Sequence, residues 1–453
     1  MSILRAFRQL RQGRLPGQVV IQLTDRCNAR CPQCGMRATN PFARTTLDTA
    51  EVRRAIDVAA RHGMAALSFT GGEPLLEMDR LVELITYAGR QGIPYIRTGT
   101  NGFAFCGKTA AERRQRITAV ARRLANTPLR NFWISVDSAI PTIHEGMRGL
   151  KGVVEGIREA LPIFHEHGIY PAANLGINRN LNGAATAEVR PESFRDRDGY
   201  LAAFRQAFDT GFRRFYAQVL DMGFTMANAC YPMSVEPQTK GLDAVYTATS
   251  EDRLVRFERD EKAVLFDTLR QVIPDYRPNL RIFTPLCSLL ALSRQYRDEA
   301  GISYPCRGGL DFLFVEAHAG KAFPCGYRGH DDLGPMSELS ALPCGTASCR
   351  DCDWECFRDP SQLGGPLLEL VRHPWTLFRR VRQDREFART WFEDVRYYRS
   401  CDWFNGRCAP EPERLHRHLL PAPVPPAEPV RLPGASRAAP QTTQGMGVPG
   451  RPS

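Results

Sequence analysis

The sequence predicts an α/β fold in which a partial (β/α)6 parallel barrel is followed by a small Cys-rich auxiliary domain. From Val19 to about Leu220, short apolar runs alternate with amphipathic helical stretches, which is the pattern of βα units that build a parallel sheet. After Tyr304 this rhythm stops, and six cysteines occur between positions 306 and 356. A chain of 453 residues is long enough for two or three domains.

The barrel region contains six strand candidates with helices between them. The strands are expected over 19–23, 65–70, 95–98, 132–136, 169–175 and 212–220, and the helices around 48–63, 81–88, 117–124, 153–161 and 252–272. The first helix has the clearest signals, because Asp48 and Glu51 form a D-x-x-E start and Gly63 stands where a C-terminal glycine would. In such folds the chemistry gathers at the carboxyl ends of the strands.

The two ends of the chain differ from the barrel region. Residues 1–17 mix Phe7 and other apolar residues with four arginines and predict an amphipathic helix, for which packing beside the first strand is favoured over contact with a membrane. This segment has no apolar signal-peptide core and no stretch is long enough to span a bilayer, so a cytoplasmic location is expected. Residues 420–453 are rich in Pro, Ala and Gly and predict a disordered tail. The domains between are expected over 18–295 and 300–410.

Charge and cysteine content narrow the class of protein. The net charge is +11, but the arginines are spread over many predicted helices without a nucleic-acid-binding motif, which favours a solvated surface over nucleic acid as partner. Fourteen cysteines without an export signal favour metal binding over disulfides. Cys106, Cys230 and Cys287 stand alone and are expected to be small buried residues.

The loop after the first strand carries the main chemical signal, a C-x3-C-x2-C triad formed by Cys27, Cys31 and Cys34. Three thiolates can ligate three irons of a cubane iron-sulfur cluster and leave its fourth iron without a protein ligand. A structural zinc site would need a fourth ligand, and this loop holds no further Cys or His. The triad therefore predicts an iron-sulfur cluster with one open iron.

This triad resembles that of the radical S-adenosylmethionine (SAM) superfamily. The resemblance implies that the open iron of a [4Fe-4S] cluster chelates SAM, and that an electron from the cluster cleaves SAM to a 5′-deoxyadenosyl radical that takes hydrogen from a substrate. It assigns no catalytic side chain beyond the cluster. Gln33 departs from the family pattern, which usually has an aromatic residue just before the third cysteine.

Further motifs follow the triad at successive strand ends. The Gly-Gly-Glu-Pro segment resembles the family motif that contacts the SAM amino group, although alone it would be an ordinary strand-to-helix connection. It is followed by a T-N-G element, by an S-x-D-S element near the expected ribose position, and by the end of the fifth strand. For the S-x-D-S element, a capped helix start is the alternative to a ligand contact. The resemblance implies SAM contacts at Gly71, Gly72, Glu73, Pro74, Asn101, Ser135, Asp137 and Asn178.

The later cysteines resemble a SPASM domain, the auxiliary-cluster module of sulfatase maturases and peptide-modifying relatives. Cys306, Gly320 and Cys325 match its C-x13-G-x4-C start, and a β-hairpin between the two cysteines is expected to bring their thiols together. The following run departs from the full SPASM spacing, and zinc is the alternative. The auxiliary ligands are therefore expected among Cys306, Cys325, Cys344, Cys349, Cys352 and Cys356. With Cys401 and Cys408 the count permits one or two clusters.

The leading hypothesis for function is a radical SAM oxidoreductase that abstracts hydrogen from a peptide or small metabolite. A radical SAM transferase or synthase without net oxidation is the alternative, and a non-catalytic iron-sulfur or zinc protein is the third hypothesis. The expected partners are the substrate and an electron donor such as flavodoxin or ferredoxin, with no nucleic acid and no membrane span. The stretch from Trp375 to Arg399 is predicted to be core-packed helix.

Overall fold

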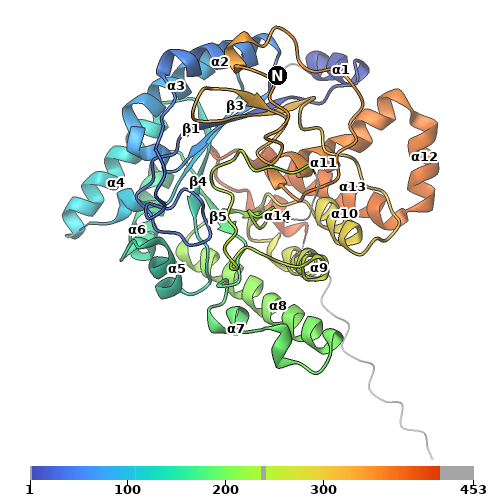
Figure 1. Cartoon of the computed structure of the whole chain (residues 1–453). Coiled ribbons are helices and arrows are strands. Elements are labelled where there is room, and N and C mark those ends of the chain that lie inside the picture. Colours follow the sequence, from blue (N-terminus) through green and yellow to red (C-terminus); the bar gives the residue numbers. More distant parts are fainter. Residues whose placement is uncertain (1–2, 108, 236–240, 419–453) are drawn as a thin grey trace, which may run out of the picture. The chain divides into compact units, whose positions relative to one another are not determined.

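The computed structural model describes residues 3–107, 109–235 and 241–418, which fall within one compact unit (Figure 1). The predicted disordered tail, 420–453, lies outside the described residues. Among the helices that are described, none is long and apolar enough to cross a membrane.

The described strands form one sheet in the order β7-β6-β5-β4-β3-β2-β1-β8-β9. Every neighbouring pair is parallel except β8 and β9. The α/β fold with a mostly parallel sheet is therefore confirmed. The strands are β1 (Gln18–Thr24), β2 (Ala66–Gly71), β3 (Tyr95–Thr100), β4 (Leu129–Ser135), β5 (Ala172–Gly176), β6 (Met226–Cys230), β7 (Arg281–Ile282), β8 (Phe312–Val315) and β9 (Ala322–Phe323).

Helices occur between most strands and dominate the last hundred described residues. The α-helices are α1 (Ile3–Arg11), α2 (Thr49–Arg61), α3 (Met78–Arg90), α4 (Ala110–Ala125), α5 (Pro141–Arg148), α6 (Val153–Glu166), α7 (Ala184–Ala187), α8 (Arg197–Met222), α9 (Arg259–Tyr276), α10 (Leu286–Tyr296), α11 (Glu355–Arg372), α12 (Pro374–Gln383), α13 (Arg385–Ser400) and α14 (Pro412–His416). The 3-10 helices are η1 (Pro74–Glu77), η2 (Phe103–Phe105), η3 (Pro191–Ser193), η4 (Met336–Glu338) and η5 (Asp402–Phe404).

The two faces of the sheet differ in polarity because side chains alternate along each strand. On β2, Leu67 and Phe69 join the main apolar core with residues of α2, α3, α4 and α6, which lie along the outer side of the sheet in Figure 1. Ser68 and Thr70, on the other face of the same strand, are only half-buried. On β2, the face turned away from the main core is therefore the more polar one.

The predicted sixth strand, 212–220, is wrong, because these residues lie inside α8. The buried residues of this helix include Phe208, Phe212, Phe215 and Val219, which recur at helical spacing. The predicted strand was only nine residues long and rich in apolar residues, so the helical period could not be recognised within it. The sixth strand is β6, which pairs with β5. The helix predicted over 252–272 begins later, at Arg259, behind a capping box.

The hairpin predicted between Cys306 and Cys325 is confirmed, with Phe314 paired to Phe323 across β8 and β9. β8 also pairs with β1 in parallel, so the Cys-rich segment continues the sheet of the barrel. This placement brings the second cysteine group next to the strand that leads into the first.

The N-terminal helix α1 contacts α11, and its Leu10 packs against the apolar cluster that includes Val20 of β1. One helix prediction needs correction. The stretch from Trp375 to Arg399 was expected to be core-packed, but only its second helix, α13, has buried residues. None of the residues of α12 is buried.

Candidate active site

The triad Cys27, Cys31 and Cys34 lies in the loop between β1 and α2. The amide of Cys34 donates to the carbonyl of Cys31 at 3.1 Å, so a tight turn holds the second and third cysteines together. Burial, with a smaller contribution from the neighbouring thiols, raises the pKa of the Cys31 thiol to about 11 and that of Cys34 to about 12. Metal binding at this loop would therefore have to displace protons from the thiols.

The paired glycines hold the end of β2 against this loop. A Cβ atom at Gly71 would lie 2.4 Å from the carbonyl oxygen of Thr24, and one at Gly72 would lie 2.2 Å from that of Arg26. Two hydrogen bonds complete the contact, from the Gly72 amide to Thr24 and from the Glu73 amide to Arg26, at 2.7 and 2.8 Å. Only glycine permits this close backbone approach.

Glu73 is completely buried and joins the ends of two strands. Its carboxylate accepts hydrogen bonds from the amides of Leu75 and Asn101, at 3.1 and 2.6 Å. Burial raises its pKa to about 7, and these hydrogen bonds offset part of that effect. Pro74 is buried and begins η1. The predicted contact of Glu73 with the SAM amino group stays a prediction, in addition to this structural role.

Asn101 lies directly beside the first cysteine. Its side-chain nitrogen is 3.8 Å from the sulfur of Cys27 and donates to Asn28 Oδ1 at 2.8 Å. Its side-chain oxygen accepts from the amide of Phe103 at 2.9 Å. Asn101 thus connects the end of β3 to the triad.

Asp137, two residues after β4 ends at Ser135, is the centre of a buried hydrogen-bond network. Its Oδ2 accepts from Arg148 Nη2 at 2.6 Å and from Gln33 Nε2 at 2.9 Å. Asn178 donates to its backbone carbonyl at 2.8 Å, which links the ends of β4 and β5. The network places Asp137 and Asn178 together, whereas the predicted SAM contacts of these residues and of Ser135 stay predictions.

The triad loop is attached to the end of β4 through Gln33, and Arg148 shares the same partner, Asp137. The Gln33 amide donates to Asp137, while its Oε1 has no partner among the described residues. Arg148 is close enough to lower the pKa of both Cys27 and Cys31, against the larger effect of burial. Arg148 continues the S-x-D-S element of the sequence and directly precedes the left-handed Gly149 that ends α5.

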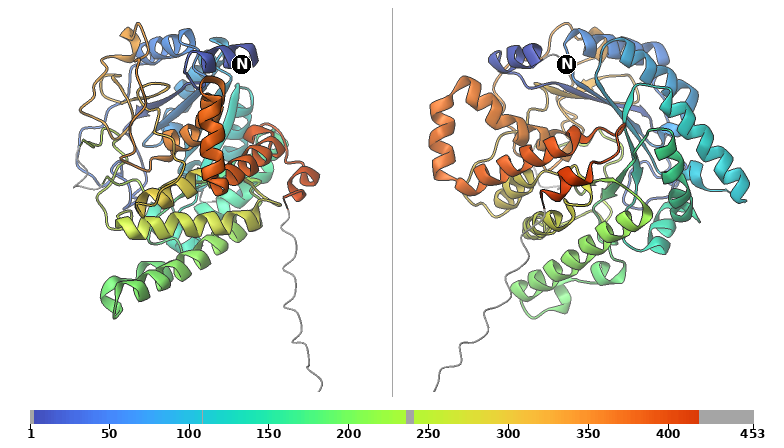
Figure 2. Two further views of the ribbon diagram at one scale, coloured as in Figure 1. Left: turned by 90° about the vertical axis from the view of Figure 1, so that its right-hand side faces the viewer. Right: turned by 180° about the vertical axis from the view of Figure 1, so that it is seen from behind.

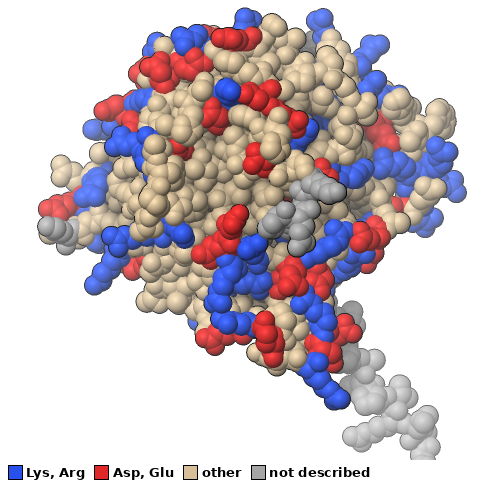
Figure 3. All heavy atoms as spheres, viewed as in Figure 1, with Lys and Arg blue, Asp and Glu red and all other residues tan. Residues whose placement is uncertain are grey.

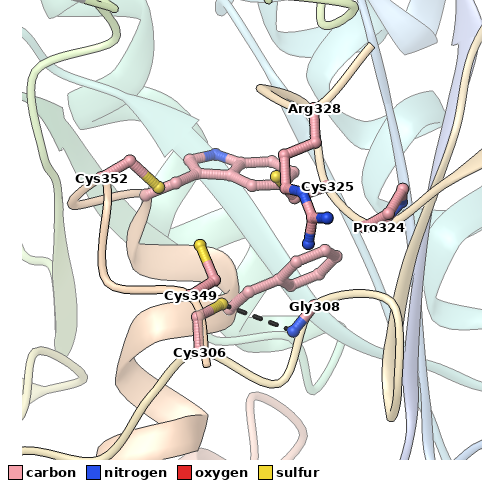
Figure 4. A pocket seen from close by; sticks show the side chains of 9 residues that line it. Cys306, Gly308, Pro324, Cys325, Arg328, Cys349 and Cys352 are labelled. Carbon is pink, nitrogen blue, oxygen red and sulfur yellow. Dashed lines mark hydrogen bonds between the residues drawn. The ribbon is translucent and has the colours of Figure 1, made fainter. Parts of the chain in front are cut away.

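Four of the six later cysteines line one cavity (Figure 4). Figure 4 shows the sulfurs of Cys306, Cys325, Cys349 and Cys352 turned toward a common space, with Arg328 reaching toward it. Aromatic rings close the cavity, and the amide of Cys306 donates to the carbonyl of Cys349 at 2.8 Å. The expectation that the hairpin brings Cys306 and Cys325 together is met.

The other cysteines do not line this cavity, and the full set of six auxiliary ligands stays a prediction. Cys344 is exposed, with its sulfur 3.8 Å from Arg14 Nη2, and Cys356 points to Glu355 Oε1 at 3.6 Å. Both Cys401 and Cys408 lie near Arg281, at the amino end of β7. The spacing of the run could not reveal this division, because Cys356 is the second residue of α11, whereas Cys352 lies in the loop before that helix.

A third group of residues on the inner face was missed from the sequence. Cys230 ends β6, its sulfur lies 3.2 Å from Asn174 Oδ1, and the charges of Glu355 and Cys356 add to burial in raising its pKa. Burial also raises the pKa of Glu355 to about 7, and its Oε2 has no hydrogen-bond partner among the described residues. Correct placement of the sixth strand would have put Cys230 at a strand end.

Tyr246 connects this inner group to the triad. Its hydroxyl is 3.1 Å from Thr70 Oγ1, and the charges of Cys34, Cys356 and Cys230 all raise its pKa in addition to burial. The triad and the Cys230–Glu355–Cys356 group therefore both lie near this ring.

The cysteine groups fit iron-sulfur clusters by the chemistry of their donors. Each thiolate of a cubane cluster binds a different iron, so the thiolates need not meet at one point. Within the described residues, no three Cys, His, Asp or Glu side chains are arranged to hold a single metal ion. Three thiols in one loop and four around one cavity are instead suited to a partly and a fully protein-ligated cluster.

Comparisons with known proteins agree with this chemistry. Residues 21–178 match the model of the radical SAM superfamily. The chain is 30% identical over 154 residues to a probable GTP 3′,8-cyclase of Thermococcus kodakarensis, covering 33% of this chain and 46% of that protein. It is 28% identical over 307 residues to an AdoMet-dependent heme synthase of Oleidesulfovibrio alaskensis, covering 68% of each. It thus spans less than half of the first of these relatives.

The solved structures that match this chain share little sequence with it. Native anSMEcpe with bound AdoMet is 13% identical, with 71% of this chain and 78% of that chain covered and a TM-score of 0.45. Streptococcus suis SuiB bound to S-adenosylmethionine is 15% identical, with 77% and 67% covered and a TM-score of 0.44.

Proposed function

We propose that this chain, which carries a radical SAM domain over residues 21–178, is an oxidoreductase that reductively cleaves SAM and abstracts hydrogen from a peptide or small-metabolite substrate. Cys27, Cys31 and Cys34 would hold the SAM-binding cluster, and Cys306, Cys325, Cys349 and Cys352 an auxiliary one. When bound, the first cluster would supply the electron that cleaves SAM, and the auxiliary cluster would supply an acceptor for the electron that remains on the substrate after hydrogen abstraction.

The observation that carries the proposal is the four-cysteine cavity. Four thiols around one space provide a ligand for every iron of a cubane cluster, which leaves no iron open for substrate. This favours electron transfer over direct substrate binding at the second site. Net removal of electrons from the substrate separates an oxidoreductase from a transferase or synthase.

Glu355 provides the matching proton acceptor in this proposal. Loss of a hydrogen atom and then an electron from a carbon centre leaves a proton to be removed. Glu355 Oε2 has no partner among the described residues, and a carboxyl with a pKa near 7 exchanges a proton readily at neutral pH. The inner face offers Arg97 and Asn174 as half-buried polar groups that can orient a polar substrate.

The arrangement around the triad would orient SAM through this chain's own groups. Asn101 and the network of Asp137, Arg148 and Asn178 hold the strand ends in fixed positions, and the predicted contacts at Gly71–Pro74 lie at the same end of the sheet. A reductant such as flavodoxin or ferredoxin would supply the first electron. We place the enzyme in the cytoplasm, where thiols stay reduced.

The test is anaerobic reconstitution with iron and sulfide, followed by SAM and dithionite. The proposal expects 5′-deoxyadenosine from the native chain and none from Cys27→Ala. Absence of 5′-deoxyadenosine from the native chain with full iron content would overturn the radical SAM activity.

The oxidoreductase assignment needs product masses from candidate substrates. A dehydrogenated or crosslinked product supports it, and a product heavier by a donated group supports the transferase alternative. Glu355→Gln is expected to keep 5′-deoxyadenosine formation while lowering oxidised product, because the amide cannot accept the proton.

A further inference from the structure

We propose that α12 and the adjoining end of α11 form a docking surface for a membrane that contains anionic lipids. The surface consists of Leu367, Leu370, Arg372, Trp375, Phe378, Arg379 and Arg382. This inference concerns where the protein acts and is independent of the reaction proposed above.

The exposed face of α12 combines large apolar side chains with arginines. Trp375, Phe378, Arg379 and Arg382 stand at i, i+3, i+4 and i+7 and therefore share one side of the helix. Trp375 is 83% exposed and Phe378 is 56% exposed. An apolar face with an aromatic residue and flanking arginines is the composition of helices that lie in a bilayer interface.

The opposite side of α12 is anchored to the protein, so the exposed face is fixed in orientation. Arg380 pairs with Glu369 at 2.9 Å and its guanidinium lies over the ring of Tyr304. Figure 2, left, shows α12 lying on the surface with no described element in front of it. The exposed side chains are therefore presented outward.

Leu367 and Leu370 extend the apolar part of this surface onto α11, and both are exposed. At the corner between the two helices, Arg372 approaches Gly13, just after α1. Phe7, Arg8 and Arg11 on α1 are also exposed. The same combination of aromatic and basic residues thus continues onto a neighbouring helix.

Charge decides which partner fits this surface. Arg372, Arg379 and Arg382 form no ion pair with any described residue, whereas the nearby acids Glu369, Asp384 and Glu386 are each paired with an arginine. Figure 3 shows basic and uncharged atoms together over α12, at the right-hand edge of that face. Anionic headgroups would neutralise these arginines while the Trp and Phe rings enter the interface.

The experiment is co-sedimentation of the full chain with vesicles of phosphatidylcholine alone or mixed with phosphatidylglycerol. Binding is expected only to the mixed vesicles and should weaken as salt is added. Trp375→Ala/Phe378→Ala and Arg379→Glu/Arg382→Glu should each reduce the bound fraction. Loss of one basic residue near an anionic surface weakens membrane partitioning about five-fold. Because Arg379→Glu/Arg382→Glu removes two basic residues, it should bind at least about twenty-five-fold more weakly than the native chain.

A matched control separates the effect of this surface on vesicle binding from the effect of the protein's net charge. Arg114→Glu/Arg122→Glu changes the same number of charges on α4, on another side of the protein, and should bind nearly as the native chain does. Unchanged circular dichroism and melting temperature confirm folding, which is expected because no residue of α12 is buried.

Three results would overturn the proposal: no binding to the mixed vesicles, equal loss in the α4 control, or binding that the α12 variants leave intact. Concentration-dependent association of the native chain that the α12 variants abolish, without vesicle binding, would assign this surface to a second copy of the chain instead.

Discussion

Arg148 Nη2 lies 2.6 Å from Asp137 Oδ2, and both side chains are buried beside the loop that carries the cysteine triad. The pair connects the end of β4 to α5, and Gln33 of the triad loop bonds to the same carboxylate oxygen. A buried ion pair of this kind contributes little net stability, but removal of one partner leaves an uncompensated charge.

The first prediction concerns this pair. Arg148→Met should lower the free energy of unfolding by about 3–5 kcal/mol, because Asp137 then stays buried without its cation. Urea unfolding of metal-free protein measures the loss. The double variant Arg148→Met/Asp137→Asn removes the buried negative charge while keeping an acceptor for Gln33. It should recover much of the lost free energy of unfolding. Equal stability of the single and double variants would contradict the argument.

The second prediction concerns the close contact between β2 and the triad loop. Gly72→Ala places a Cβ 2.2 Å from the Arg26 carbonyl, so the loop must move. We expect a loss of about 1–3 kcal/mol in stability from overpacking and lower iron retention after reconstitution. Gly146→Ala in α5 is the matched control, because no atom lies within 4 Å of its added Cβ. If both variants lose the same stability and the same iron, the contact between Gly72 and the Arg26 carbonyl does not determine either property.

The third prediction separates the later cysteines. In a background with Cys27, Cys31 and Cys34 changed to Ala, the chain should still bind about four irons with the absorbance of a [4Fe-4S] cluster. Adding Cys352→Ala should abolish this signal, since Cys352 lines the cavity, and adding Cys344→Ala should preserve it. Zinc in place of iron, or equal loss in both variants, would refute the ligand set.

The fourth prediction concerns Asp359, a buried carboxyl of α11. Burial raises its pKa to about 8, and its Oδ1 accepts from Tyr231 at 3.0 Å and Ser288 at 2.5 Å. The folded state therefore holds a proton that the unfolded state releases near pH 4, so stability should fall as pH rises from about 4 to about 8, by at most about 1.4 kcal/mol per pH unit from this group.

Asp359→Asn keeps the accepting oxygen and removes the titration. The variant should match the native chain near pH 4 and be more stable at pH 8, as measured by urea unfolding at each pH. If the difference in free energy of unfolding between the native chain and the variant does not change with pH, the role of Asp359 is disproved.

Much of the fold could be predicted because its signals are local. Five of the six predicted strands overlap the observed ones, and Asp48 caps α2 through hydrogen bonds to the amides of Ala50 and Glu51, as its D-x-x-E start indicates. The sixth strand was missed because the apolar residues of α8 are dense enough to imitate a buried strand. That error also concealed Cys230 at the end of β6.

The sequence by itself determined the resemblance to the radical SAM superfamily, since the triad and the motifs at strand ends are contiguous segments whose spacing fixes which donors a single loop can present. The tertiary structure alone decided which later cysteines line one cavity, that Arg148 and Gln33 meet at Asp137, and that α12 is exposed. These depend on contacts between residues far apart in the chain, where the rotation of a helix or the pairing of β8 with β1 decides which side chains meet.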